Sequence, residues 1–473
     1  MSPEEFLPLS PQANILVVNS KGNLHSLRFS LETVLLLNEK NYSLSFIDLG
    51  SYDPEFSGVK RIKVLFRNIL NKNSYQNIIY NKLNNEKITI IKPRTALTFL
   101  FDIYFFSFIK IFFSKKPRIS NLEMIPINSW VSTRAGHTKF DWNLTNKYTA
   151  YQALIAIKKT KITFKNLLNK KEYSNIYTFN GRFPVDSTII SICNSKLIPY
   201  FLYDGGSLAN DNYNRIQYFK TSPHNYIEVK NKIDSYWDNG CENDRELIAL
   251  NTLNDLVVGK RSLGSSFNWV EDSNFVNFQT NLSKTVVFYS SSDWEQGAIS
   301  QWKSQSGFLN QFEAVEELYK ACRELGLHLL VKTHPIKKNY RGKQSENSEL
   351  LVWKKFTAGK KISLAWPGEY SSSPYQLLNK ATINVGYRTS LSAQAMYLQK
   401  KVIILTDTLW RSDELNSNYA DSYLQIVNQL DYMLNNSEVK YNLLPIYKWA
   451  YYQGVHGAKM RFSSFDSGKF QIL

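Results

Sequence analysis

Short, continuously apolar runs alternate with stretches of helical periodicity along the whole chain. The first run covers residues 14–19 and ends at polar residues, and a helical pattern over 24–37 follows it. Apolar runs of this length are typical of parallel strands buried on both faces, and their alternation with helices indicates βαβ units. Further strands are predicted at 44–49, 88–91, 175–179 and 197–203, and helices at 148–158 and 186–194. We therefore expect the first half of the chain to form a mostly parallel α/β sheet.

A second series of the same kind begins after a polar stretch at 272–283. Its predicted strands are 284–289, 328–333, 381–385 and 401–405, and its predicted helices are 311–325, 374–379 and 390–398. Two α/β halves in succession predict two Rossmann-like domains, 1–275 and 276–440, that face a central cleft, the usual place for a ligand. We expect the last segment, 441–473, to pack back on the first domain.

Length and composition agree with two globular domains. The chain has 473 residues, of which 43% are hydrophobic and 21% charged, and this length exceeds what one ordinary core accommodates. Its formal net charge of +17 favours anionic partners such as nucleotides, nucleic acid or the anionic face of a membrane. The lysines are spread through the chain, so we do not expect nucleic acid as a partner.

The cysteines and the first residues indicate a cytoplasmic protein without a metal site. Cys193, Cys241 and Cys322 are far apart and match neither a zinc-binding spacing nor a disulfide framework. The first ten residues contain acids and prolines where a secretory signal would have a basic and then an apolar run. The chain also lacks G-x-G-x-x-G, Walker, G-x-S-x-G and H-E-x-x-H motifs, which disfavours dehydrogenase, NTPase, hydrolase and zinc-protease functions.

The segment 95–113 is aromatic, strongly apolar and bordered by basic residues at 92–94 and 115–118. It is long enough to span a membrane, but Asp102 and Lys110 lie inside it, and a charge is costly at the bilayer centre. An aromatic helix with basic flanks fits better in the interface of an anionic membrane, which predicts peripheral attachment to the inner face of the cytoplasmic membrane. A helix packed into the first domain or against a partner explains the same pattern, so both interpretations stay open.

Polar residues directly end the strand predicted at 328–333, in the sequence Lys332-Thr333-His334-Pro335. Open α/β sheets bind their ligands at the carboxyl ends of the strands, so Lys332, His334 and Pro335 are candidates for contacting a donor phosphate. An ordinary turn in which Pro335 ends the strand explains the same residues.

Two further groups follow strands of the first half. Asn180 and Arg182 come directly after residue 179, and a guanidinium there suits a bidentate pair with a carboxylate or phosphate. Asp204 precedes Gly205, whose conformational freedom allows the chain to turn away at the end of the strand. The carboxylate of Asp204 would then be exposed at the carboxyl edge of the sheet, where it could act as a general base. The candidates for substrate binding are Asn180, Arg182, Gly205 and Ser207. Plain turns, with Asp204 as a cap, are the alternative.

The second half offers two comparable groups at strand ends. They consist of Ser290, Ser291 and Ser292 after the strand at 284–289, and of Gly386, Thr389 and Ser390 before the helix at 390–398. The serine hydroxyls and backbone N–H groups suit a phosphate or a ribose, and free N–H groups at a helix start favour an anion. Helix capping explains both groups without a ligand.

Together these motifs resemble bacterial capsule and surface-polysaccharide biosynthesis proteins of the GT-B glycosyltransferase type. The resemblance covers about residues 175–410 and rests on the segments 179–183, 286–293, 332–335, 373–378, 386–390 and 401–405. A narrower similarity links Asp204 to the first acid of the acid-acid-Gly motif of bacterial sialyltransferases, and His334 to their His-Pro motif. In this chain Gly205 replaces the second acid of that motif, and Thr389 replaces the first of the paired serines that precede a helix.

The resemblance implies a fold, an activity and residue roles. The implied protein has the GT-B fold and is an inverting, metal-independent glycosyltransferase that acts on a glycan or glycolipid acceptor in capsule or lipopolysaccharide biosynthesis. It needs no cofactor beside its nucleotide-sugar donor, for which a CMP-activated ulosonic acid such as Kdo or a sialic-acid-like sugar is expected. Asp204 is implied as the general base, His334 and Ser390 as contacts of the donor phosphate. A UDP-sugar or CDP-polyol-phosphate transferase and a non-catalytic glycan-assembly subunit are the alternatives, the last because of Gly205.

Overall fold

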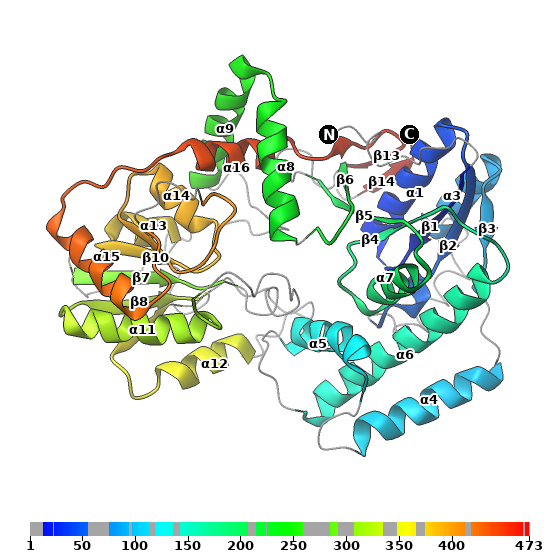
Figure 1. Cartoon of the computed structure of the whole chain (residues 1–473), viewed down its shortest axis with the longest axis horizontal. Coiled ribbons are helices and arrows are strands. Elements are labelled where there is room, and N and C mark those ends of the chain that lie inside the picture. The colour runs from blue at the N-terminus through cyan, green and yellow to red at the C-terminus, as the bar shows by residue number, and fades with distance from the viewer. Residues whose placement is uncertain are drawn as a thin grey trace. The chain divides into compact units, whose positions relative to one another are not determined.

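The chain forms two compact units, shown with their labelled elements in the computed structural model of Figure 1. Unit 1 consists of Met1–Glu228 and His456–Leu473, and unit 2 of Val229–Val455. The structure describes residues 13–21, 23–54, 75–93, 97–113, 119–135, 142–206, 214–223, 225–258, 284–291, 307–333, 348–365, 374–411, 418–466 and 469–472. The α/β class and the two mostly parallel sheets predicted from the sequence are confirmed.

Unit 1 is built on a seven-stranded sheet of order β12-β6-β5-β4-β1-β2-β3. The strands are β1 (Asn14–Asn19), β2 (Ser43–Asp48), β3 (Thr89–Ile91), β4 (Asn175–Phe179), β5 (Tyr200–Gly205), β6 (Arg215–Phe219) and β12 (Ala458–Lys459). The pairs from β3 to β5 are parallel, whereas β6 is antiparallel to both β5 and β12. The carboxyl ends of β1, β2, β4 and β5 therefore lie along one edge.

Helices cover both faces of this sheet (Figure 1). One face is covered by α1 (Leu24–Glu39) and α3 (Tyr75–Asn85), and the other by α6 (Leu144–Leu168) and α7 (Pro184–Lys196). Helices α4 (Leu97–Phe112) and α5 (Asn121–Ala135) pack against α6, and a 3-10 helix η2 (Gly50–Tyr52) follows β2. Successive residues of a strand point to opposite faces, so Val17 packs against α1 while Val18 packs against α6 and α7. Both faces of β1 are thus fully buried, which explains its uninterrupted apolar run.

The final segment of the chain completes unit 1. Strand β12 pairs with β6, and the buried carboxylate of Glu32 in α1 accepts hydrogen bonds from the backbone N–H groups of Arg461 and Phe462. The guanidinium of Arg461 also forms two hydrogen bonds, of 2.7 and 2.9 Å, to the carboxylate of Glu39. A hairpin of β13 (Ser463–Asp466) and β14 (Lys469–Ile472) follows.

Unit 2 has a fully parallel five-stranded sheet of order β11-β10-β7-β8-β9. Its strands are β7 (Thr285–Tyr289), β8 (His328–Lys332), β9 (Ile362–Ala365), β10 (Ile383–Gly386) and β11 (Val402–Ile404). Its helices are α9 (Glu242–Val257), α11 (Gln311–Glu324), α12 (Ser348–Thr357), α13 (Pro374–Lys380), α14 (Leu391–Tyr397), α15 (Tyr423–Asn435) and α16 (Leu444–Val455), and α8 (Tyr226–Asp238) begins at the boundary between the units.

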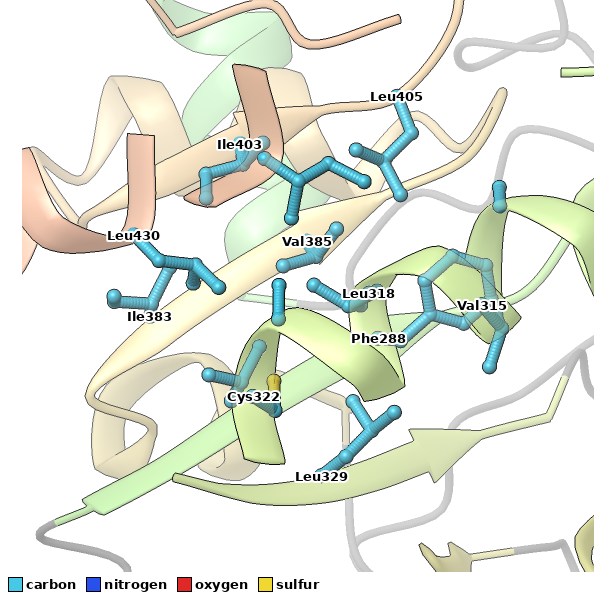
Figure 2. Packing of buried hydrophobic residues seen from close by; sticks show 14 of the residues in the cluster. Phe288, Val315, Leu318, Cys322, Leu329, Ile383, Val385, Ile403, Leu405 and Leu430 are labelled. Atoms are coloured by element: carbon cyan, nitrogen blue, oxygen red, sulfur yellow. The ribbon is translucent and has the colours of Figure 1, made fainter. Parts of the chain in front are cut away.

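The core of unit 2 lies between the sheet and helices α11 and α15. Figure 2 shows Leu318 and Cys322 of α11 beside Phe288 of β7 and Val385 of β10, with Leu430 of α15 in the same cluster. All five side chains have an exposed fraction of 0%. The central strands of this unit are therefore anchored in a densely packed core.

The boundaries of the units differ from those expected from the sequence. Residues 229–258, which the sequence places with the first half, belong to unit 2, because α9 packs along α16 with Gly454 against Thr252. Of the last segment, α16 belongs to unit 2 and only the residues from His456 onward belong to unit 1. These unit boundaries depend on contacts between elements about 200 residues apart in the chain. Local sequence patterns cannot predict such contacts.

Helix α4 lies where an apolar segment was expected at 95–113. Ile103, Ser107 and Ile111 are buried on the side that packs against α6, while most of the opposite side is exposed. The side chain of Asp102 lies outside the described residues, and Lys110 is exposed. In the part of the chain that the structure describes, no helix is both long and apolar enough to cross a membrane.

Candidate functional site

The carboxyl edge of the unit 1 sheet gathers polar residues from three neighbouring strands. Strand β1 lies beside β4, and β4 lies beside β5, all in parallel. Asn19 ends β1, Asn180 directly follows β4, and Asp204 lies at the end of β5. The sequence prediction that Asp204, Asn180 and Arg182 stand at strand ends holds in the structure, and the topology places these strand ends side by side.

Asp204 is held by two hydrogen-bond donors. The side-chain amide of Asn180 donates to Oδ2 over 2.5 Å, and the N–H of Gly205 donates to Oδ1 over 2.8 Å. Burial raises the pKa of this carboxyl group, whereas the two hydrogen bonds and the positive charge of Arg182 act in the opposite direction. Because both oxygens have a fixed donor, the partly buried carboxylate keeps one orientation.

A left-handed turn after β4 places Asn180 beside Asp204. The backbone φ angle is +40° at Asn180 and +83° at Gly181. A Cβ atom at Gly181 would lie 2.7 Å from Ile190 Cδ1 and 2.9 Å from Leu202 Cδ1, so a larger residue would be strained and would displace these side chains. The chain then runs through Arg182, whose guanidinium lies 4.6 Å from the ring centre of Phe183, into α7.

Three charged residues that the sequence did not single out adjoin this edge. The ammonium group of Lys21, directly after β1, lies 3.6 Å from the carboxylate of Asp53 and 3.3 Å from the ring centre of Phe183. Asp186, in the first turn of α7, is 0% exposed. Lys21 and Asp53 are also buried, at 5% and 2% exposed. Their only signal in the sequence is that Lys21 follows a predicted strand, as Asn180 and Asp204 do.

The carboxyl edge of the unit 2 sheet carries a second polar group. Tyr289 of β7 is in register with Lys332 of β8 on one side and with Gly386 of β10 on the other. Ser290 follows Tyr289, and its N–H donates to the carbonyl of Lys332 over 3.0 Å. Three groups predicted to bind the donor, at Ser290, Lys332 and Gly386, are therefore neighbours at one edge.

Lys332 is the most unusual residue of this edge. Its side chain is 5% exposed, and its ammonium group has no ion pair or hydrogen bond to any residue that the structure describes. Burial lowers its pKa to about 8. A buried cation without a counter-charge is costly, and an anion bound at this edge would relieve that cost.

The turn before α14 contains the other predicted donor contacts. Arg388 has a φ angle of +48°, and Ser390 occupies the cap position of α14 without capping it through its side chain. The hydroxyl of Thr389 instead accepts from the N–H of Leu391 over 3.4 Å. Helix α14 has seven residues, so its dipole is small.

The backbone N–H of Ser291 donates to Oε1 of Gln311 over 3.2 Å, so this group is already engaged within the protein. Four of the predicted site residues lie outside the described part of the chain: Ser207, Ser292, His334 and Pro335. The predicted residues thus divide into a carboxylate group in unit 1 and a cationic, hydroxyl-bearing group in unit 2.

Comparisons with known proteins give distant structural similarities. No protein-family model and no curated protein matches the sequence. A β-Kdo 2,4 transferase, KpsC of Thermosulfurimonas dismutans, is 13% identical, with 59% of this chain and 79% of that chain covered and a TM-score of 0.38. UDP-GlcNAc 2-epimerase of Methanocaldococcus jannaschii is 10% identical, with 91% and 95% covered and a TM-score of 0.29. Sucrose-phosphate synthase of Thermosynechococcus elongatus is 10% identical, with 94% and 93% covered and a TM-score of 0.29. Any function of this chain therefore has to be argued from its own residues.

Proposed function

We propose that this protein is an inverting, metal-independent glycosyltransferase that uses a nucleotide-activated sugar. The observation that carries the proposal is the buried ammonium group of Lys332 at the carboxyl edge of a fully parallel sheet. Open parallel sheets bind nucleotides at this edge, and a donor phosphate would supply the counter-charge that Lys332 lacks among the described residues. Ser290, Ser291 and Gly386 lie at or beside the same strand ends, where the two serines add side-chain hydroxyl groups that can bind a phosphate.

Asp204 supplies the second part of the chemistry. Its carboxylate, held by Asn180 and Gly205, takes the proton of an acceptor hydroxyl as that oxygen attacks the anomeric carbon of the donor. The bond between that carbon and the phosphate oxygen breaks, and the nucleotide leaves with the electron pair. A positive charge near the phosphate, such as that of Lys332, stabilises this leaving group without a metal ion.

The proposed donor is a CMP-activated ulosonic acid such as Kdo or a sialic-acid-like sugar, and the product a capsule or lipopolysaccharide glycan. Support comes from the resemblance of the sequence motifs, with His334, Pro335, Ser292, Thr389 and Ser390 as further contacts of the donor. Arg182, aided by Ser207, is the proposed partner of an acidic group on the substrate. A UDP-sugar or CDP-polyol-phosphate donor, and a glycan-assembly subunit without catalysis, are the alternatives that the experiment below separates.

Helix α4 supports a location at a membrane surface, where a glycolipid acceptor would be found. Its outward side exposes Tyr104, Phe105, Phe106, Phe108 and Ile109, with exposed fractions between 37% and 54%. Lys110 is exposed on the same helix, and the pKa of neighbouring Lys158 is lowered by burial and, to a smaller extent, by the positive charge of Lys110. Aromatic rings bordered by lysines suit the interface of an anionic bilayer, so we propose peripheral attachment to the inner face of the cytoplasmic membrane.

A thermal-shift panel with CMP, CDP, UDP and GDP tests the proposal. A nucleotide at about 100 times its Kd stabilises the folded protein by about 2.7 kcal/mol, so the preferred base should stand out clearly. Lys332→Gln should lose most of this shift, whereas Lys354→Gln, an exposed lysine on α12, should keep it. If no nucleotide stabilises the protein, the glycan-assembly subunit replaces the transferase as the interpretation. A preference for UDP or CDP over CMP would instead indicate a UDP-sugar or a CDP-polyol-phosphate donor.

A further inference from the structure

Asp186 is a fully buried carboxyl group in the first turn of α7. It occupies the third position of α7, directly after Pro184 and Val185. Its side chain is 0% exposed, and neither carboxyl oxygen has a hydrogen bond within the described part of the chain. The buried hydroxyl of Ser20, which also has no hydrogen-bond partner there, lies close enough to Asp186 to favour its ionised form. Ionised carboxylates are rarely buried in this way, because each loses its hydration without compensation.

The charges that face Asp186 come from three other elements of unit 1. Lys21 follows β1, Asp53 follows η2, and Asp204 lies at the end of β5, where the buried phenol of Tyr203 precedes it. The positive charge of Lys21 favours the ionised form of Asp186, whereas the negative charges of Asp53 and Asp204 oppose it. Burial has the largest effect and raises the pKa of Asp186 to about 7.

The protonation state of Asp186 sets the net charge of this cluster. Lys21 is paired with Asp53, and the positive charge of Arg182 acts on Asp204, so these four residues balance when Asp186 is neutral. Ionisation of Asp186 would add an uncompensated negative charge beside Asp204. Because the two carboxyl groups repel each other when both are ionised, the protonation of one changes the pKa of the other.

We propose that Asp186 is a positioning residue for Asp204: a buried acid whose protonation state determines over which pH range Asp204 can accept a proton from the acceptor. The proposal rests on the proposed function of Asp204. Asp186 itself is closed to solvent and therefore acts through electrostatics, without touching the substrate. As the pH rises, Asp186 loses its proton, the cluster becomes negative, and Asp204 becomes a stronger base.

Infrared titration of the full-length protein tests the protonation of Asp186 without requiring activity. A protonated carboxyl group has a C=O band distinct from that of a carboxylate, and in the wild-type protein one such band should disappear close to neutral pH. Asp186→Asn should lack this transition, and Asp431→Asn, which alters an exposed aspartate of α15, should retain it. In Asp204→Asn the transition should move to lower pH, because one of the negative charges that oppose ionisation of Asp186 is removed.

Transfer activity gives the second readout. The rate of the wild-type protein should change with an ionisation close to neutral pH, and Asp186→Asn, whose amide mimics the neutral acid, should lose that change while it keeps the rate measured at pH 6. A wild-type protein without the infrared transition overturns the proposal, even if Asp186→Asn fails to fold. A transition that does not move in Asp204→Asn overturns the coupling. If transfer is absent from every variant but the infrared results hold, the proposed function fails while the neutral state of Asp186 stands.

Discussion

The side-chain amide of Asn180 donates a 2.5 Å hydrogen bond to Oδ2 of Asp204 across two adjacent parallel strands. This bond fixes the carboxylate and opposes the rise of its pKa that burial causes. The bond connects the turn after β4 with the end of β5. The conformation of that turn, which positions the Asn180 side chain, therefore influences the pKa of Asp204. The first prediction concerns this pair.

Asp204→Asn should lower the transfer rate by about 10² to 10⁴, the range for loss of a general base, because an amide cannot accept the acceptor proton. Asn180→Ala should lower it less and should raise the pKa of Asp204, so the acid side of the pH–rate profile moves to higher pH. The rate and its pH dependence are the measurements. Both variants should keep the thermal shift given by the preferred nucleotide, which separates loss of chemistry from loss of folding. Wild-type rates in Asp204→Asn would remove it as the base.

Lys332 should make the stability of unit 2 depend on pH. Its folded pKa of about 8 lies below the value of about 10.4 for an unfolded chain, so between these values the unfolded state binds more protons. The free energy of unfolding should therefore rise from pH 8 to pH 10.4, by up to about 3 kcal/mol, and this group should contribute no slope below pH 8.

Lys332→Met should abolish that rise and should stabilise the ligand-free protein at neutral pH, since it removes a buried cation. Urea unfolding followed by tryptophan fluorescence, to which buried Trp353 in unit 2 contributes, measures both effects. Lys354→Met, which changes an exposed lysine, is the control and should behave like the wild type. An unchanged slope in Lys332→Met would show that another group causes it.

Gly181→Ala should destabilise unit 1 by about 2 to 4 kcal/mol. The new Cβ atom would collide with Ile190 and Leu202, and its left-handed backbone conformation costs an L-residue about 1 to 2 kcal/mol. Gly326→Ala is a matched control: its φ angle of +65° is also left-handed, but a Cβ atom there meets nothing within 4 Å. Chemical denaturation should show only the smaller cost in the control, and equal losses would contradict the steric explanation.

Phe105→Ser combined with Phe106→Ser should reduce binding to vesicles that contain anionic lipid, because it removes two of the exposed rings of α4. Co-sedimentation at low and high salt measures this binding, and salt should weaken it through the lysine contribution. Leu424→Ser, at a residue of α15 that is 72% exposed, controls for loss of apolar surface in general. Equal binding of wild type and double variant would assign the exposed face to a protein partner instead.

The sequence predicted the elements whose pattern is local. Continuous apolar runs located β1, β4, β7 and β8, because strands buried on both faces must be apolar throughout. It missed β6, whose Arg215 and Gln217 alternate with apolar residues, and it missed α5, which contains Pro126. Each of these departs from the patterns on which the prediction depends.

Site residues could be predicted from the sequence where polar side chains directly follow a predicted strand. Asp204, Asn180 and Lys332 were predicted because parallel strands bring their carboxyl ends to one edge. Asp186 was not, since an acid in the first turn of a helix is the ordinary partner of the helix dipole and its burial cannot be read from its neighbours. The ion pair between Lys21 and Asp53 could not be predicted either, because these residues lie in different loops that only the fold of unit 1 brings together.

The edge strand β12 has a consequence for how the protein is made. Ala458 and Lys459 pair with β6, yet the ribosome adds them only after all of the 227 residues of Val229–Val455. During synthesis, β6 must therefore wait with one side unpaired while unit 2 emerges and folds. Exposed strand edges promote aggregation, so we expect nascent unit 1 to depend on chaperones until translation has delivered its closing strand.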